Sequence, residues 1–204
     1  MIAVSLLVAG ICLTGVSGPP AAMTDSLAPL YRSGRTWEEF FAAAKARKET
    51  WRDNYRRGLP DSAAVERARA VGGSWRVLAV AEDWCGDSAN TIPYLVRLVE
   101  QVPSLEIRIV NSKSGKWVME SHKTPDGRAA TPTVVLLDVE GRERGCFVER
   151  PAKLRAWVDE NKPKLSDDDF QAGKMAWYRD DQGRETVNEF VEMLESAAVG
   201  SVRC

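Results

Sequence analysis

The residues with the clearest chemical potential lie in the stretch Trp84-Cys85-Gly86-Asp87-Ser88. This stretch follows an apolar run at residues 75–80, which predicts a buried strand leading into a helix. A cysteine at that junction meets unpaired backbone N–H groups and the positive end of the helix dipole, and both favour the thiolate. Because the thiolate is the nucleophile in thiol–disulfide exchange, we predict that Cys85 is a reactive, catalytic thiol.

Nearby acidic residues oppose part of this effect. Asp87 lies two residues from Cys85, and its negative charge disfavours the thiolate. Glu82 and Asp83 add to this opposition if their side chains point inward. We therefore expect a weaker preference for the thiolate than in a typical redox thiol. The alternative is a structural relic, a scaffold that kept the turn and lost the activity.

Two further landmarks follow the turn. Pro93 stands eight residues beyond Cys85, and Ala130-Thr131-Pro132-Thr133 precedes the apolar run of residues 134–137. Together with the turn at residues 82–88, this order resembles the thioredoxin family, whose turn usually reads Trp-Cys-Gly-Pro-Cys. More narrowly, it resembles bacterial thioredoxin-like proteins with a Trp-Cys-Gly-Asp-Ser or Trp-Cys-Gly-Asp-Cys turn. The resemblance covers roughly residues 74–150.

The resemblance implies an α/β thioredoxin fold, a central mixed sheet flanked by helices. It also implies that the Thr131–Pro132 peptide bond is cis and faces Cys85. In that arrangement the Thr131 backbone is free to pair with an extended substrate chain. Gly86 is expected to allow a tight turn and a close approach of the substrate backbone. We therefore assign Thr131, Pro132, Gly86 and the flanking Trp84 to substrate binding.

Two positions depart from the family pattern. Ser88 stands where a dithiol oxidoreductase carries its second cysteine, so no disulfide can form within the turn. Ala79 stands where thioredoxins carry a buried acid that accepts a proton. Ser88 remains a candidate catalytic residue, which either donates a hydrogen bond to the sulfur or caps the helix.

These features predict a monothiol thiol–disulfide oxidoreductase that forms a mixed disulfide at Cys85, which an external thiol then resolves. The expected partner is a disulfide-bearing protein or a low-molecular-weight thiol. The alternative is a non-catalytic binding module that holds a peptide in the groove beside Pro132. An iron–sulfur carrier, like the glutaredoxins with a Cys-Gly-Phe-Ser turn, is disfavoured because Asp87 replaces the aromatic residue. We expect no cofactor.

The other cysteines, Cys12, Cys146 and Cys204, are widely scattered. Their spacing matches neither a metal site nor a disulfide-rich framework, so we expect no metal. We predict that Cys146 acts as a small buried hydrophobe out of reach of Cys85, and that Cys204 is a mobile free thiol. His122, the only histidine, lies in a polar stretch and is expected to be solvated.

Composition narrows the classes of partner. The 204 residues carry a net charge of −1 and are 44% hydrophobic, without a long block of basic residues. No nucleic-acid partner is therefore expected. We also expect a monomer without a stable membrane span.

The chain is predicted to have four parts. Residues 1–22 form an apolar segment, either a signal peptide or an upstream extension: Ile2 to Val16 has the length of a signal-peptide core, but no Lys or Arg precedes it. We expect a cytoplasmic protein, with export as the alternative if this segment is a signal peptide. Residues 23–73 indicate a helical N-terminal extension, with one helix running from Thr36 to about Tyr55. Alternating strands and helices at residues 74–162 indicate the thioredoxin-like domain, and residues 163–204 a C-terminal helical extension without recognisable chemistry.

Overall fold

The fold is organised around one four-stranded sheet. The computed structural model describes residues 27–204, so the apolar segment predicted at residues 1–22 lies outside the described residues. The strands are β1 (Trp75–Val80), β2 (Leu105–Val110), β3 (Thr133–Leu137) and β4 (Glu143–Val148). Their order is β2-β1-β3-β4, with β1 and β2 parallel and the other neighbours antiparallel. The predicted central mixed sheet is confirmed.

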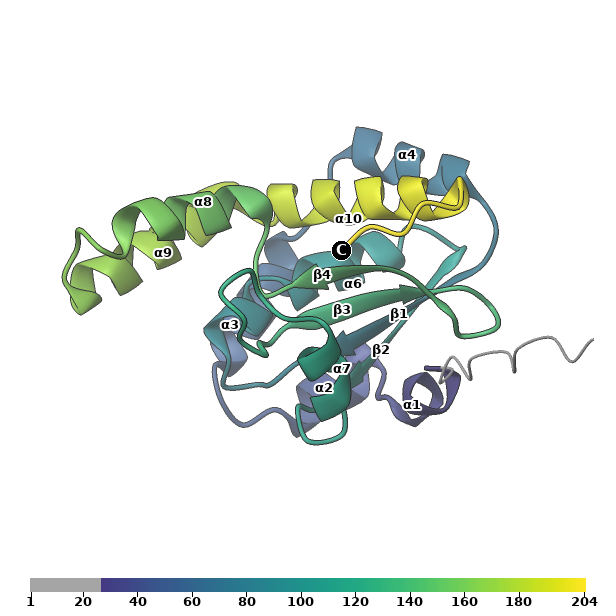
Figure 1. Ribbon diagram of the computed structural model, residues 1–204, viewed down its shortest axis with the longest axis horizontal. Helices are drawn as coiled ribbons and strands as arrows, with labels where there is room; N and C mark the ends of the chain where they lie inside the picture. The colour runs from purple at the N-terminus through teal and green to yellow at the C-terminus, as the bar shows by residue number, and fades with distance from the viewer. Residues whose placement is uncertain (1–26) are drawn as a thin grey trace, which may run out of the picture.

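Helices cover both faces of this sheet (Figure 1). One face packs against α1 (Ala28–Ser33) and α7 (Lys116–Ser121). The opposite face packs against α2 (Trp37–Ala43), α3 (Lys48–Arg57), α4 (Ser62–Val71), α6 (Ile92–Val99) and α10 (Arg184–Ala198). None of the helices within residues 27–204 combines the length and the apolar character that a membrane span requires.

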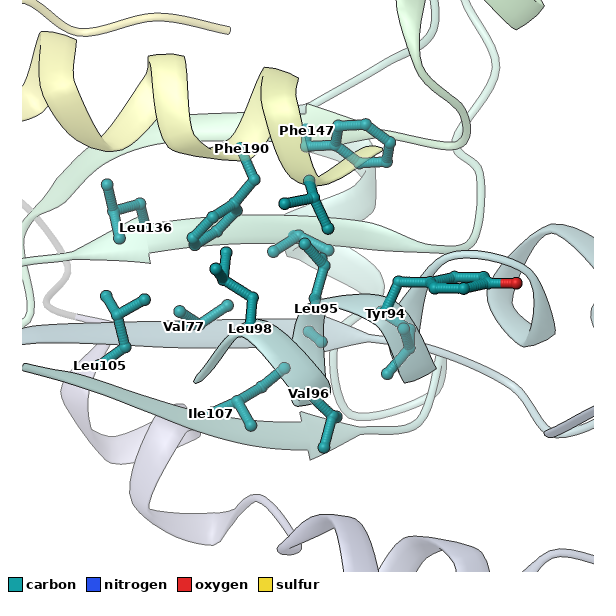
Figure 2. Close-up of a cluster of buried hydrophobic side chains, with 14 of the residues drawn as sticks. Val77, Tyr94, Leu95, Val96, Leu98, Leu105, Ile107, Leu136, Phe147 and Phe190 are labelled. Atoms are coloured by element: carbon teal, nitrogen blue, oxygen red, sulfur yellow. The ribbon is translucent and has the colours of Figure 1, made fainter. Parts of the chain in front are cut away.

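The alternation of side chains along β1 explains this layering. Successive strand residues point to opposite faces, so Val77 and Ala79 join the larger cluster while Leu78 and Val80 join the smaller one. All four are fully buried, because helices cover the sheet on both sides. Figure 2 shows the larger cluster, where Phe190 of α10 meets side chains of the sheet and of α6.

The single helix predicted from Thr36 to about Tyr55 is wrong. Thr36 does cap a helix, through a capping box with Glu39, but α2 ends at Ala43 and α3 begins only at Lys48. Between them the backbone N–H groups of Lys45 and Ala46 donate to the carboxylate of Asp83, at 2.6 and 3.1 Å. A continuous helix would use those N–H groups internally, so the interruption makes them available to the turn that precedes Cys85.

The C-terminal part adds a second helical layer. Helices α8 (Ala152–Asn161) and α9 (Asp167–Asp181) form a hairpin that extends beyond the end of the sheet (Figure 1). The hairpin has its own small core, formed by Leu154 and Val158 from α8 and by Phe170 and Tyr178 from α9. Helix α10 then returns across the sheet and contacts both α4 and β4. Lys174 of the hairpin pairs with Asp87, two residues after Cys85, whereas the buried residues of α10 belong to the larger core cluster.

Candidate functional site

Cys85 occupies the position that the sequence predicts, between β1 and a helix. It is the N-cap residue of the short helix α5 (Gly86–Ala89). Its sulfur accepts a hydrogen bond from the Ser88 backbone N–H at 3.4 Å. The thiol in turn donates to the backbone carbonyl of Thr131 at 3.2 Å. The residue is 9% exposed, so most of its side chain is covered by protein.

The Thr-Pro loop brings residues distant in sequence to this sulfur. The Thr131–Pro132 peptide bond is cis, as the resemblance implies. Two contacts hold the loop: the Pro132 carbonyl accepts from the Glu149 N–H at 2.7 Å, and the Thr133 hydroxyl donates to the Ala130 carbonyl at 2.7 Å. The predicted proximity of Cys85 and the Thr131–Pro132 pair is confirmed.

Ser88 performs neither of the two roles that the sequence leaves open. Its side chain is fully buried, and its hydroxyl has no hydrogen-bond partner among residues 27–204. Cys85, not Ser88, caps the helix, and the contact with the sulfur comes from the backbone of Ser88. Residue 88 therefore points into protein within the first turn after Cys85, where a second thiol would stand in a dithiol protein.

The Asp87 carboxylate is surrounded by buried partners. Its carboxylate pairs with Arg150 at 3.1 Å and with Lys174 of α9 at 3.3 Å. The Tyr178 hydroxyl donates to the same carboxylate at 2.9 Å. All three partners are at most 9% exposed. The Asp87 carboxylate therefore has buried partners of its own, one of which, Arg150, it shares with Glu149, and its opposition to the Cys85 thiolate stays a prediction.

The same cluster perturbs Tyr178. Burial raises the pKa of its hydroxyl well above the ordinary value, and the neighbouring charge of Asp87 raises it further. The phenol therefore stays protonated and remains a hydrogen-bond donor to Asp87 across the physiological range. Sequence reasoning missed Arg150, Lys174 and Tyr178. The available signal was the i, i+4 spacing of Phe170, Lys174 and Tyr178, which places a lysine on the buried face of α9.

The acidic residues before Cys85 also have partners elsewhere. Glu82 accepts hydrogen bonds from the backbone N–H and the hydroxyl of Ser112. Burial by itself raises the pKa of Asp83, but the N–H donors of Lys45 and Ala46 outweigh it, and the pKa lies below its ordinary value. The buried indole of Trp51 donates to the Asp83 carbonyl at 2.9 Å, which anchors this segment on α3. The two carboxylates thus tie the segment before Cys85 to Ser112 and to the connection between α2 and α3.

One exposed cation beside the turn was also missed. Arg47, the N-cap residue of α3, has a left-handed backbone with φ of 49°. Its Nε donates to the carbonyl of Trp84 at 2.7 Å, so its guanidinium lies next to the active turn. The Trp84 side chain is 59% exposed. An indole and a guanidinium are thus presented together at the edge of the Cys85 site.

Gly86 is not required by the conformation of the turn, contrary to expectation. Its φ is not among the positive values found in other glycines, such as Gly72 and Gly183. A Cβ at this position would meet only the Arg47 guanidinium, at 3.8 Å, which is an ordinary contact. Of the two roles expected for Gly86, only room for a substrate is left.

The variant Gly86→Ala tests whether the conformation of the turn needs a glycine at position 86. We expect the variant to keep or raise the free energy of unfolding, by up to about 1 kcal/mol, because alanine reduces the entropy of the unfolded chain. Urea denaturation followed by circular dichroism measures the change. A loss of more than about 1 kcal/mol would show that the turn does need glycine at this position.

Cys146 is buried as predicted, but the prediction that Cys146 and Cys204 are unpaired is wrong. Cys146 and Cys204 form a disulfide, with a Cα–Cα distance of 4.5 Å. The C-terminal segment runs back beside β4, where the Cys146 N–H donates to the Arg203 carbonyl at 2.8 Å. His122 is not solvated either, since its ring nitrogens contact the Val118 carbonyl and the Glu143 carboxylate. Cys85 is the free cysteine of residues 27–204.

Comparisons with known proteins agree with this architecture. No curated protein matches the chain. The chain resembles the crystal structure of a protein of unknown function from Pseudomonas aeruginosa, at 24% identity and a TM-score of 0.64. It also resembles an HIV epitope scaffold, at 22% identity and a TM-score of 0.66. Each likeness covers 84% of this chain and 98% of the other, and at this identity each shows the fold alone.

A family model described as thioredoxin matches residues 34–163. This match spans more than half of the chain, and it includes the Trp-Cys turn, the sheet and the cis-proline loop described above. The chain therefore belongs to the thioredoxin family.

Proposed function

We propose that this protein is a monothiol thiol–disulfide oxidoreductase that acts through a mixed disulfide at Cys85. One observation carries the proposal: the free thiol of Cys85 caps a helix and contacts the Thr131 carbonyl beside a cis-proline. A sulfur in that position is next to both the helix N–H groups that stabilise a thiolate and a backbone edge that an extended chain can use.

The reaction consists of two exchanges. The Cys85 thiolate attacks one sulfur of a substrate disulfide, the substrate S–S bond breaks, and the other substrate sulfur leaves as a thiolate. An external thiol, as its thiolate, then attacks the substrate sulfur of the mixed disulfide, forms a new disulfide with it and releases the Cys85 thiolate. The net result is that one substrate sulfur becomes a thiol and the other forms a disulfide with the external thiol.

An internal thiol is poorly placed for the second exchange. Cys146 lies opposite Val135, which in turn lies opposite Leu78 of β1. Two strand spacings separate Cys146 from Leu78, about 10 Å, and Cys85 lies beyond the end of β1. A disulfide needs Cα atoms within about 7 Å. Because Ser88 has no thiol and Cys146 is disulfide-bonded, residues 27–204 supply no second thiol near Cys85, and the proposal assigns resolution to an external molecule.

Four residues are proposed to hold the substrate. The Thr131 N–H donates to no backbone acceptor in the described part of the chain, so it is available to an extended peptide. Pro132 is proposed to contact the substrate beside Thr131, and Gly86, where an added Cβ would meet only the Arg47 guanidinium at 3.8 Å, is proposed to admit the substrate backbone. The exposed indole of Trp84 supplies apolar contact area at the rim.

The test follows turnover of a peptide–glutathione mixed disulfide, with glutathione as the second thiol. We expect the wild-type chain to catalyse release of the peptide thiol and to carry glutathione on Cys85, as peptide mapping shows. Cys85→Ser is expected to abolish both signals. Cys12→Ser is the matched control and is expected to retain both. Equal turnover by Cys85→Ser and wild type would refute the proposal.

The second candidate is a non-catalytic binding module. It is favoured by the Trp84 side chain, which is 59% exposed next to Cys85, because a large exposed apolar side chain often marks a binding surface. Such a protein would bind extended peptides equally well with or without the Cys85 sulfur. Binding of a peptide library to wild type and to Cys85→Ser separates the candidates. Unchanged binding in the variant, together with no turnover by the wild type, would establish the binding module.

A further inference from the structure

Four potential metal ligands meet far from the Cys85 turn. They are His122, which follows α7, Glu143 and Cys146 of β4, and Cys204 at the end of the chain. Their donor atoms all lie within 4.8 Å of one another. We call these four residues the His122–Cys204 cluster. Residues 122 and 204 are far apart in the sequence, which is why spacing arguments alone predict no metal.

We propose that the His122–Cys204 cluster binds a zinc ion when the Cys146–Cys204 disulfide is reduced. The cluster then offers two thiolates, one imidazole nitrogen and one carboxylate oxygen. Structural zinc is bound by four such ligands in a tetrahedral arrangement, and sulfur and imidazole donors favour zinc over magnesium or calcium. The proposal concerns a different cysteine pair from Cys85 and does not depend on the proposed oxidoreductase activity.

The imidazole is already oriented for this role. The Nδ1 atom of His122 lies 2.7 Å from the Val118 carbonyl, which can only accept, so Nδ1 carries the hydrogen. The other ring nitrogen, Nε2, faces the Glu143 carboxylate at 2.8 Å. A hydrogen bond from one ring nitrogen to a backbone carbonyl is the support that metal-binding histidines commonly have. In the oxidised protein Nε2 therefore donates to the Glu143 carboxylate, and a zinc ion would take the place of that hydrogen between the two ligands.

The backbone holds the two cysteines together independently of their disulfide. The Cys146 N–H donates to the Arg203 carbonyl, and Gly145 forms a parallel bridge with Arg203. A Cβ on Gly145 would lie 2.8 Å from the Arg203 carbonyl and 2.6 Å from Met193, so only glycine allows this approach. Figure 1 shows the C-terminal segment returning to β4. Reduction therefore leaves both sulfurs beside His122 and Glu143.

An entry path for the ion is also present. A surface pocket is lined by His122, Cys146 and Cys204, together with Lys123 and Pro125. Cys204 is exposed, and its sulfur lies 3.5 Å from the carboxylate of Glu143, which is partly exposed. An ion arriving from solvent can thus reach three of the donors through the pocket and the fourth from the surface beside it.

The redox balance is simple. A dithiol reductant transfers two electrons and two protons to the Cys146–Cys204 bond, giving two protein thiols and one reductant disulfide. Zinc binding then releases both thiol protons, because thiolates are the ligands. A disulfide oxidant reverses the sequence: it accepts two electrons and becomes a dithiol, the two protein sulfurs bond to each other, and the zinc ion loses its thiolate ligands and is released.

The experiment measures zinc and cobalt binding to the full chain carrying Cys12→Ser and Cys85→Ser, so that no other cysteine contributes. A water-soluble phosphine reduces the disulfide without competing strongly for zinc; it becomes the phosphine oxide with oxygen from water, whose hydrogens go to the sulfurs. We expect the reduced protein to bind one zinc ion per chain. Cobalt is expected to give thiolate charge-transfer and tetrahedral absorption bands. The oxidised protein is expected to give neither signal.

Single variants in that background identify the ligands. His122→Ala, Glu143→Gln and Cys204→Ser are each expected to weaken zinc binding by at least about 10–100-fold, the loss seen when groups that merely support ligands are removed. Glu120→Gln, an exposed glutamate on α7, is the matched control and is expected to bind normally. Cys204→Ser alters an exposed residue, so it tests the site without disturbing the core.

Two results would overturn the proposal. The first is the absence of zinc binding by the reduced, folded protein, with folding checked by circular dichroism. The second is binding that depends on the cysteines but is unaffected by His122→Ala and Glu143→Gln, which would mean a simple dithiol chelate. Because Cys85 is absent from the background, neither result bears on the oxidoreductase proposal.

Discussion

Ser88→Cys is expected to convert the turn into one that forms an internal disulfide. Residue 88 lies three positions after Cys85 in a helical turn, where Cα atoms are about 5 Å apart, within disulfide range. The Ser88 N–H already contacts the Cys85 sulfur. Its buried hydroxyl has no partner in the described region, so a thiol replaces it without breaking a hydrogen bond. We expect nearly all of the oxidised variant to carry a disulfide between Cys85 and the introduced thiol, against none in wild type.

Mass spectrometry after mild oxidation measures this bond, and insulin reduction in the presence of a dithiol measures the gain in activity. Ser88→Ala is the matched control, expected to remain monothiol with unchanged stability. We expect reductase activity to rise by about tenfold or more, since an intramolecular thiol replaces a bimolecular step. Buried Ala79 supplies no base, so the gain stays below that of a complete dithiol site. No internal bond in folded Ser88→Cys would mean that the side chain of residue 88 points away from the sulfur.

Asp87→Asn is expected to lower the free energy of unfolding by about 3–5 kcal/mol, the cost of removing one partner from a buried ion pair. Asparagine keeps the size of the side chain and an acceptor for the Tyr178 hydroxyl, so the change isolates the charge. Arg150 retains Glu149 at 2.6 Å. Lys174, however, has Asp87 as its ion-pair partner within the described residues, and the variant leaves its buried ammonium uncompensated.

Urea denaturation gives the loss directly, and two further variants make the result specific. Asp53→Asn removes a carboxylate from an exposed ion pair with Arg57 and is expected to change stability little. Adding Lys174→Met to Asp87→Asn is expected to recover part of the loss, because the unpaired charge is then absent. If Asp87→Asn and Asp53→Asn had equal effects, the buried cluster would have no special role in stability.

The Asp87 cluster also connects two parts of the molecule. Asp87 lies within the first turn after Cys85, whereas Lys174 and Tyr178 belong to α9 of the C-terminal hairpin. Met175 of the same helix contacts the Asn90 side chain at 4.0 Å. The hairpin is therefore docked on the active turn by a buried ion pair, so the aspartate at this position of the motif has a structural role.

The local sequence by itself determined the main elements and the placement of the thiol. The apolar run at residues 75–80 and the Trp-Cys turn predicted β1 and a helix N-terminus at Cys85, and Thr131–Pro132 predicted the cis-proline loop through the family resemblance. These features depend on residues close together in the chain or on a family motif that retains its order. For the same reason the helix predicted to begin at Thr36 does begin there, with Thr36 as its cap.

The tertiary structure alone decided which side chains meet. The Asp83 carboxylate accepts hydrogen bonds from the backbone N–H groups of Lys45 and Ala46. These two residues lie where the helix that the sequence pattern predicts as continuous is interrupted. Cys146 pairs with Cys204 across 58 residues because the chain end returns beside β4. Ion pairs and hydrogen bonds form between side chains that the folded structure brings close together, and these interactions are stronger in the buried interior than in water. The spacing of residues in the sequence therefore does not predict contacts between residues that lie close together only in the folded protein.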